Sequence, residues 1–250
     1  MCAGVGVHSG SHVRMVLSPA PVDTGIVFVR SDVRGVASNS IAAHADSVSE
    51  TRNCTTIRNS SGVELATIEH LMSACAGLGI DNLIVEVDGP EVPILDGSSA
   101  QFVQVLLNAG VKRQQAARRV HLSAETFLNE IADARTFGFL ADVETMRAAG
   151  LGLGASMANA VVVDSGRVVN PEGLRFDDEF VRHKMLDAVG DLSLAGAPIC
   201  GRFVADQPGH ALNARLVRAL LDTPEAWCWE HGEAVETVRE VQPALAAATR

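Results

Sequence analysis

Apolar side chains recur at helical spacing from Thr67 to Leu78, and a run rich in β-branched residues follows from Asn82 to Val87. The first pattern predicts a helix that packs one apolar face, and Gly77 and Gly79 predict where it ends. The second pattern predicts a strand. The first half of the chain therefore places a helix and a strand next to each other, joined by a short turn.

Similar patterns predict the remaining elements. They are two strands joined by a turn within 13–30, a helix from Ser98 or Ser99 to near Gly110, a helix over about 124–134, a helix before Gly150, a strand pair at 160–163 and 167–169, a long helix from near Asp178 to Gly196, a strand from Ile199 to Val204, and a helix opening near His210. The composition turns basic and polar from Lys112 to Arg119. We therefore expect two units, residues 1–115 and 116–250.

Composition excludes several classes of function. The net charge of -10 argues against nucleic-acid binding, because an acidic surface cannot neutralise a phosphate backbone. No apolar run reaches the eighteen or so residues of a membrane span, and no leader sequence is evident. The five cysteines are odd in number and include no C-x-x-C pair, which argues against a disulfide framework. We expect a cytoplasmic protein.

In the predicted long helix, His183, Asp187 and Asp191 lie at i, i+4 and i+8, so they share one face with Lys184 close by. A histidine and a carboxylate one turn apart can bind one metal ion. The same stripe could instead be the solvated side of an amphipathic helix, because the opposite face is apolar. Spacing alone favours the second interpretation.

Glu69 and His70 form a second candidate pair, on the helix predicted at 67–78. Neighbours on a helix point about 100° apart, so one could bind a metal while the other reaches a water molecule. Combined with His183 and Asp187, the pair supplies three protein ligands and leaves one position open, as in catalytic zinc sites. Such a site would hydrolyse a carbonyl compound.

Other residues carry weaker signals. His210 could donate a proton if a carboxylate such as Asp191 holds it, although a lone histidine is more often a surface or capping residue. Thr136 and Phe137 could line a pocket or simply pack in a strand. The glycines of 150–154 lack the strand and lysine of a phosphate-binding loop, so we expect a turn or a passage wall. The remaining histidines are interpreted as structural: His8, His12, His44, His121 and His231.

Five segments together resemble UDP-3-O-acyl-N-acetylglucosamine deacetylases, in the order of that family. They are GVGVHSG from Gly4, the stretch from Thr67 to Val103, ARTFGFL from Ala134, the stretch from Asn170 to Gly196, and GHALN from Gly209. The resemblance covers most of the chain. It implies a zinc-dependent hydrolase of lipid A biosynthesis that removes acetate from an acylated UDP-amino sugar. We expect this enzyme to act as a monomer on that small-molecule substrate.

The resemblance also implies roles for individual residues. His70, His183 and Asp187 would bind Zn²⁺, and Glu69 would be the general base on the hydrolytic water. His210 would be the acid and electrostatic partner, oriented by Asp191. The remaining implied roles are that Thr136 polarises the acetamide carbonyl and that Lys184 and Phe137 contact the substrate.

The implied fold is α+β, with two α+β units packed helix layer to helix layer and the site between them. A β-α-β insert at about 136–170 of the second unit would form a hydrophobic passage for the acyl chain. Two departures from the family are expected to alter this fold. Only three residues precede Gly4, which predicts a missing edge strand. Val120 to Asp133 replaces several dozen family residues, which predicts a reduced sheet and exposed apolar helix surface.

Two alternatives follow from these departures. The chain could be a truncated, non-catalytic paralogue that keeps the fold and a metal. It could also be a zinc amidase on another acylated amino sugar, because a shortened second unit could alter the acyl passage.

Overall fold

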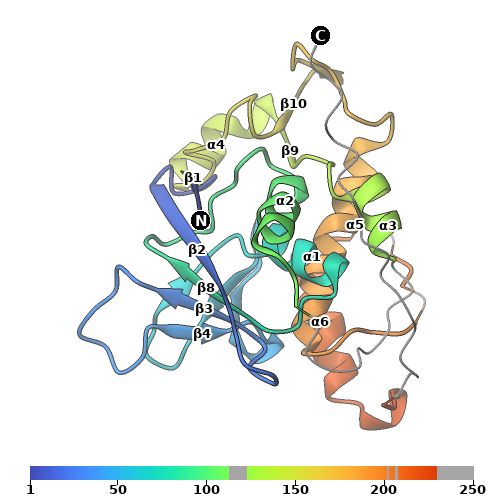
Figure 1. Ribbon diagram of the computed structural model, residues 1–250. Coiled ribbons are helices and arrows are strands. Elements are labelled where there is room, and N and C mark those ends of the chain that lie inside the picture. Colours follow the sequence, from blue (N-terminus) through green and yellow to red (C-terminus); the bar gives the residue numbers. More distant parts are fainter. Residues whose placement is uncertain (113–122, 202, 206–207, 230–250) are drawn as a thin grey trace.

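The computed structural model describes residues 1–112, 123–201, 203–205 and 208–229. Over these residues the chain has the expected α+β character, with helices interspersed among strands of three separate sheets (Figure 1). The predicted boundary falls largely in residues 113–122, outside the described part. The division into units 1–115 and 116–250 therefore stays a prediction.

The largest sheet has five strands in the order β1-β2-β8-β3-β4. These strands are β1 (Cys2–Val5), β2 (His12–Pro19), β8 (Leu83–Val87), β3 (Ile26–Arg30) and β4 (Ser40–Ala42). The two strands predicted within 13–30 are confirmed, but β8 lies between them, antiparallel to β2 and parallel to β3. The predicted lack of an edge strand is wrong. β1 pairs with β2, because ladder bonds need only backbone groups and Gly4 and Val5 supply them.

Helices α1 (Glu69–Leu78) and α2 (Ala100–Ala109) cover this sheet, and both match the sequence prediction. Gly79 ends α1 in the left-handed conformation, with φ of 65°. Fully buried side chains from strands and helices form one core, among them Phe28, Val85 and Leu71. A small sheet completes the first part of the chain, with strands β5 (Val48–Glu50), β6 (Thr56–Arg58) and β7 (Glu64–Leu65).

The helix predicted at 124–134 is present as α3 (Ala124–Thr126) followed by a π-helical turn, Phe127–Ile131. The Phe127 ring packs against Gly77 of α1, where a side chain would clash with it. Helices α5 (Glu179–Leu192) and α6 (His210–Leu221) follow. α5 packs along α1, so helices contact helices between the two parts of the chain (Figure 1).

The strand predicted from Ile199 to Val204 is wrong. Residues 199–201 and 203–205 form no strand. From Ser123 onward, every strand in the described residues belongs to the insert, so this apolar run has no neighbouring strand to pair with. This matches the predicted reduced sheet.

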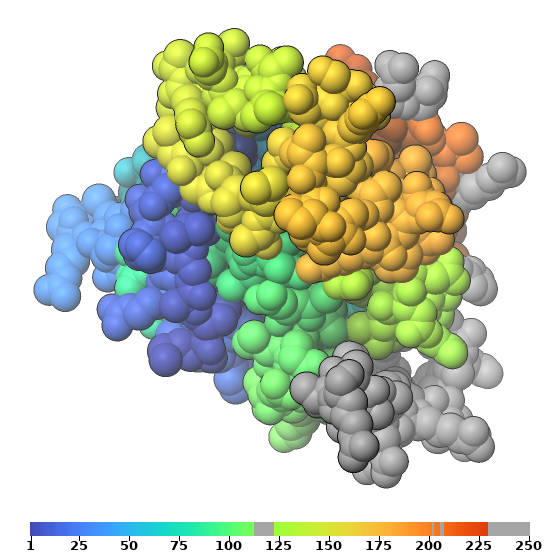
Figure 2. Space-filling view, turned by 90° about the horizontal axis from the view of Figure 1, so that it is seen from above, coloured from blue at the N-terminus to red at the C-terminus, as the bar shows by residue number. Residues whose placement is uncertain are grey.

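The insert consists of β9 (Phe137–Phe139), α4 (Val143–Ala148), β10 (Val161–Asp164) and β11 (Arg167–Val168). β9 runs parallel to β10, which confirms a β-α-β unit, and β11 returns antiparallel. Ser165 and Gly166 both have positive φ, as a tight hairpin turn requires. Figure 2 shows the insert, in yellow-green and yellow, between the blue N-terminal segment and the orange α5.

The outer faces of α5 and α6 carry exposed apolar side chains. Val181 and Met185 on α5 are 61% and 48% exposed, and Leu216 on α6 is 44% exposed. Apolar helix surface is therefore exposed, as expected; that the reduced sheet is the cause stays a prediction. No helix in the described part of the chain combines the length and apolar character that crossing a membrane requires.

Candidate active site

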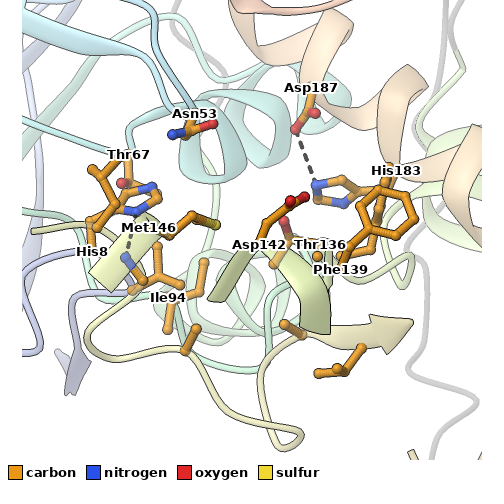
Figure 3. A pocket seen from close by; sticks show the side chains of 18 of the residues that line it. His8, Asn53, Thr67, Ile94, Thr136, Phe139, Asp142, Met146, His183 and Asp187 are labelled. Atoms are coloured by element: carbon orange, nitrogen blue, oxygen red, sulfur yellow. Dashed lines mark hydrogen bonds and ion pairs between the residues drawn. The ribbon is translucent and has the colours of Figure 1, made fainter. Parts of the chain in front are cut away.

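Three predicted ligands lie together where α1 meets α5. His70, His183 and Asp187 offer ligand atoms that all lie within 4.8 Å of one another. Asp187 Oδ1 is 3.3 Å from His183 Nε2 and 3.7 Å from His70 Nε2. The two imidazole rings are nearly perpendicular, with centroids 5.0 Å apart. Figure 3 shows His183 and Asp187 on one side of a cleft.

The polar stripe of α5 is the buried face of the helix. His183, Asp187 and Asp191 are each no more than 2% exposed, whereas Met185 points to solvent. The alternative that this stripe is a solvated surface is therefore wrong. The helix turns its charged side toward α1 because α1 presents Glu69 and His70 there, so the two polar faces bury each other.

The donor atoms of this cluster fit a metal ion. Asp187 Oδ1, the oxygen that faces the Nε2 atoms of both His70 and His183, is buried and has no hydrogen-bond partner among the described residues. Leaving a buried oxygen unsatisfied costs about 1–3 kcal/mol, unless a ligand takes it. His183 Nδ1 donates to the carbonyl of Ala134 at 3.1 Å, which leaves its Nε2 lone pair directed at Asp187. Lys184 Nζ donates to the other oxygen of Asp187 at 2.8 Å.

The protonation of the three residues also suits a metal. Burial lowers the pKa of His70 to about 3 and lowers the pKa of His183, so both imidazoles are neutral at pH 7. Burial alone would raise the pKa of Asp187, but His183 and other nearby cationic groups hold it below its ordinary value. Two neutral imidazoles and one carboxylate are a donor set that Zn²⁺ accepts.

Glu69 lies beside the cluster as the first residue of α1 and is 3% exposed. Its Oε2 accepts a hydrogen bond from the backbone N–H of Thr55 at 3.0 Å, and its Oε1 lies 3.7 Å from His210 Nε2. Burial raises the pKa of Glu69 to about 7, although His210 acts in the opposite direction. A carboxylate with such a pKa can accept a proton near neutral pH.

His210 opens α6 and pairs with Asp191 of α5. His210 Nδ1 donates to Asp191 Oδ2 at 2.9 Å, and Asn213 Nδ2 donates to the same oxygen at 2.9 Å. Thr55 Oγ1 donates to Asp191 Oδ1 at 2.6 Å. Burial lowers the pKa of His210, but the carboxylates of Glu69 and Asp191 outweigh it and raise the pKa to about 10. The imidazole is therefore protonated at pH 7, and its Nε2 faces Glu69.

One cleft of about 1040 Å³ is lined by Glu69, His70, His183, Asp187 and His210. Thr136 and Phe137 line it where β9 begins, and Lys184 lines it from α5. The Lys184 ammonium lies 5.5 Å from the centre of the Phe137 ring, and this ring stands nearly perpendicular to the His183 ring, with centroids 6.2 Å apart. The rest of the wall is mostly apolar and comes largely from the insert, including Leu140, Met146 and Met157. The glycine-rich segment contributes Leu151 and Gly152, as a passage wall would.

The sequence interpretation missed three residues at this site. Thr55 and Asn213 both donate to Asp191, and His8 lines the far side of the cleft, where its Nδ1 accepts from Gly152 N–H at 3.3 Å (Figure 3). Asn213 lies three residues after His210 on one helix, a spacing that could have indicated a shared face. Nothing in the sequence singles out Thr55. His121 and His231 lie outside the described residues.

Comparison with known proteins gives a consistent result. The chain matches the family model for UDP-3-O-acyl N-acetylglycosamine deacetylase over residues 1–123 and 117–222. It is 47% identical over 269 residues to the UDP-3-O-acyl-N-acetylglucosamine deacetylase of Phenylobacterium zucineum (strain HLK1), with 90% of this chain and 92% of the relative covered. It is 46% identical over 270 residues to the deacetylase of the same name from Shewanella frigidimarina (strain NCIMB 400), with 90% and 88% covered. This chain belongs to the UDP-3-O-acyl-N-acetylglucosamine deacetylase family.

Within this deacetylase family the chain is a shortened member. The alignment with the Phenylobacterium relative spans 269 positions, although this chain contributes only 90% of its 250 residues. Part of the relative therefore has no counterpart here. The family model also matches in two separate segments, which overlap at residues 117–123 of this chain. Both facts agree with the predicted loss of family residues between Arg119 and Ala134.

Proposed function

We propose that this chain hydrolyses the N-acetyl group of UDP-3-O-(3-hydroxyacyl)-N-acetylglucosamine in lipid A biosynthesis. The products are UDP-3-O-acyl-glucosamine and acetate. The observation that carries the proposal is the buried cluster of His70, His183 and Asp187, with Glu69 and His210 facing the same cleft. The names of the relatives describe the same reaction.

The three clustered residues would hold Zn²⁺. Catalytic zinc sites use three protein ligands and leave a fourth position open, and two histidines with one carboxylate are a known set. Zinc held there would supply a Lewis acid for the acetyl carbonyl and would lower the pKa of a water molecule to about 7. Lys184 offsets part of the negative charge of Asp187 and holds its Oδ2, so that Oδ1 remains free for the ion.

Glu69 would act as the general base. Burial raises the pKa of Glu69 to about 7. The carboxylate can therefore take a proton from the attacking water near neutral pH. The hydrogen bond from Thr55 N–H holds Oε2, and Oε1 lies 3.7 Å from His210 Nε2.

His210 would act as the general acid. Asp191 fixes its Nδ1–H, and the raised pKa keeps the ring protonated at neutral pH. The Nε2–H can then stabilise negative charge developing on the carbonyl oxygen and donate its proton to the leaving amine. Thr136, which lines the cleft, would add a hydroxyl donor to the same oxygen.

The remaining cleft suits an acylated sugar. Phe137 and Lys184 offer a ring face and a cation beside the reacting centre, and we assign both to substrate contact. The apolar wall of the insert would receive the acyl chain. A monomeric state and a cytoplasmic location stay predictions from the sequence.

The proposal is tested by incubating the zinc-supplied protein with the acylated UDP-amino sugar and measuring both acetate and free amine. We expect turnover, and we expect His210→Ala to lower it by about 10² to 10⁴ with zinc content unchanged. A cooperatively folded, zinc-loaded protein that releases no acetate would instead support the non-catalytic alternative. Faster acetate release from a different acylated amino sugar would support the zinc amidase alternative.

A further inference from the structure

Thr55 lies in the loop between β5 and β6 and touches residues from three helices. It is 1% exposed. Its backbone N–H donates to Glu69 Oε2 on α1 at 3.0 Å, and its hydroxyl donates to Asp191 Oδ1 on α5 at 2.6 Å. The same hydroxyl oxygen lies 3.3 Å from His210 Nδ1 on α6. One residue outside the helices therefore contacts both the base and the acid of the proposed reaction.

The hydroxyl of Thr55 fixes the plane of the Asp191 carboxylate. Asp191 Oδ2 accepts from His210 and Asn213, whereas Thr55 is the donor that the structure gives to Oδ1. The Asp191 carboxylate can rotate about its Cβ–Cγ bond. Donors on both oxygens are needed to hold it in one orientation. That orientation sets the direction of the His210 ring, and hence of its Nε2–H.

We propose that Thr55 is a positioning residue that aligns Glu69 and the Asp191–His210 pair for proton transfer. The inference rests on the proposed deacetylase function. The two hydrogen bonds of Thr55 can be tested separately, because the bond to Glu69 uses the backbone N–H and the bond to Asp191 uses the side-chain hydroxyl. A side-chain substitution therefore removes the hydrogen bond to Asp191 and leaves the hydrogen bond to Glu69 in place.

Thr55→Val replaces the hydroxyl with a methyl group of similar size. We expect kcat for acetate release to fall about 10- to 100-fold, the range for losing one hydrogen bond to a charged group, with KM and zinc content unchanged. Thr55→Ser keeps the hydroxyl and should restore kcat close to the wild-type value. Thr56→Val is a matched control, because the neighbouring hydroxyl contacts Cys54 and not the site.

A double-mutant cycle separates positioning from general structural damage. If Thr55 acts through His210, Thr55→Val should cost little in a His210→Ala background. If it merely loosens the fold, the two losses should multiply, and unfolding of Thr55→Val should become less cooperative. Multiplying losses, or a loss that Thr55→Ser does not rescue, would overturn the proposal.

An activity-independent measurement keeps this test apart from that of the proposed function. The His210 Nδ1 proton, assigned by ¹⁵N NMR as the signal missing in His210→Ala, should be protected from exchange in the wild type. It should shift and exchange faster in Thr55→Val but not in Thr56→Val. If the wild type released no acetate, the deacetylase function would fail, yet this signal would still decide the role of Thr55. An unchanged Nδ1 proton in Thr55→Val would refute it.

Discussion

Gly190 on α5 lies directly against the backbone carbonyl of Glu69 on α1, so closely that any side chain at Gly190 would overlap it. The missing side chain lets the two helix backbones approach each other. His70 follows Glu69, and Asp187 precedes Gly190 by almost one turn. The contact therefore brings the proposed ligands of the two helices within reach of one ion.

Gly190→Ala should push α5 away from α1. We expect the free energy of unfolding to fall by about 1–3 kcal/mol, the usual cost of overpacking, and zinc content to fall with it. Denaturant unfolding and metal analysis of the same preparation measure both. Gly138→Ala is the control for stability, because a Cβ at Gly138 has open space around it. Unchanged stability and full zinc content in Gly190→Ala would contradict the account.

The helices were predictable from local patterns, whereas the candidate ligand set came from the family resemblance, because spacing alone favoured a solvated face. Spacing placed His183, Asp187 and Asp191 on one face, and the glycine after Leu78 ends α1 as expected. Spacing could not say which face of α5 is buried. By hydrophobicity the solvent side should be polar, yet Met185 is exposed and Asp187 is buried, because the partner of this face is another polar surface.

The features that the sequence could not supply depend on contacts between distant segments. β8 enters the sheet between β2 and β3, an order that strand patterns do not encode. The apolar run from Ile199 suggested a strand, but a strand needs a pairing partner that the described residues do not offer. Thr55 carries no local signal, since its role comes from contacts with residues 14, 136 and 155 positions away.

The protonation of His210 should make the free energy of unfolding depend on pH. Its pKa is about 10 in the folded protein and about 6.5 in an unfolded chain, so folding favours the protonated ring. The resulting stabilisation is fully present below about pH 6.5 and is lost as pH rises toward 10. We expect the difference in unfolding free energy between wild type and His210→Ala to shrink from pH 6 to pH 10. A difference that grows with pH would contradict the assigned protonation.

Asp191→Asn should move the alkaline side of the kcat–pH profile to lower pH. Asp191 helps to raise the pKa of His210, so removing its charge lets the acid lose its proton earlier. The measurement is kcat for acetate release from pH 6 to pH 10, with zinc content checked in each sample. An alkaline limb at the wild-type position would show that another group is the acid.

Gly154 joins the insert to the segment that follows β1. Its N–H donates to the carbonyl of Val7 at 2.9 Å, and a Cβ would overlap the carbonyl of Gly6. Gly154→Ala should therefore shift this wall of the cleft, raising KM and changing the preference for acyl length while zinc content stays the same. Ala148→Ser, on the exposed end of α4, is the control. The role would be contradicted if Gly154→Ala had the same KM as the wild type for a short-chain substrate and also for a long-chain substrate.

The uncovered faces of α5 and α6 should tolerate polar residues. Because Val181 and Leu216 are exposed, Val181→Ser and Leu216→Ser should each change the free energy of unfolding by no more than about 0.5 kcal/mol. Leu186→Ala, at a fully buried position of α5, should cost about 2–5 kcal/mol in the same urea titration. A large loss in Val181→Ser would show that this face is covered in solution.

Zinc stoichiometry tests the account most directly. The chain should be purified from a zinc-supplied preparation and analysed for metal alongside His183→Ala, Asp187→Ala and Met185→Ala. We expect close to one zinc per chain in the wild type and in Met185→Ala, and almost none in the other two. The shared site on which the mechanism depends would be contradicted by a wild-type protein that is folded but free of zinc. Full zinc content in His183→Ala and in Asp187→Ala would contradict it as well.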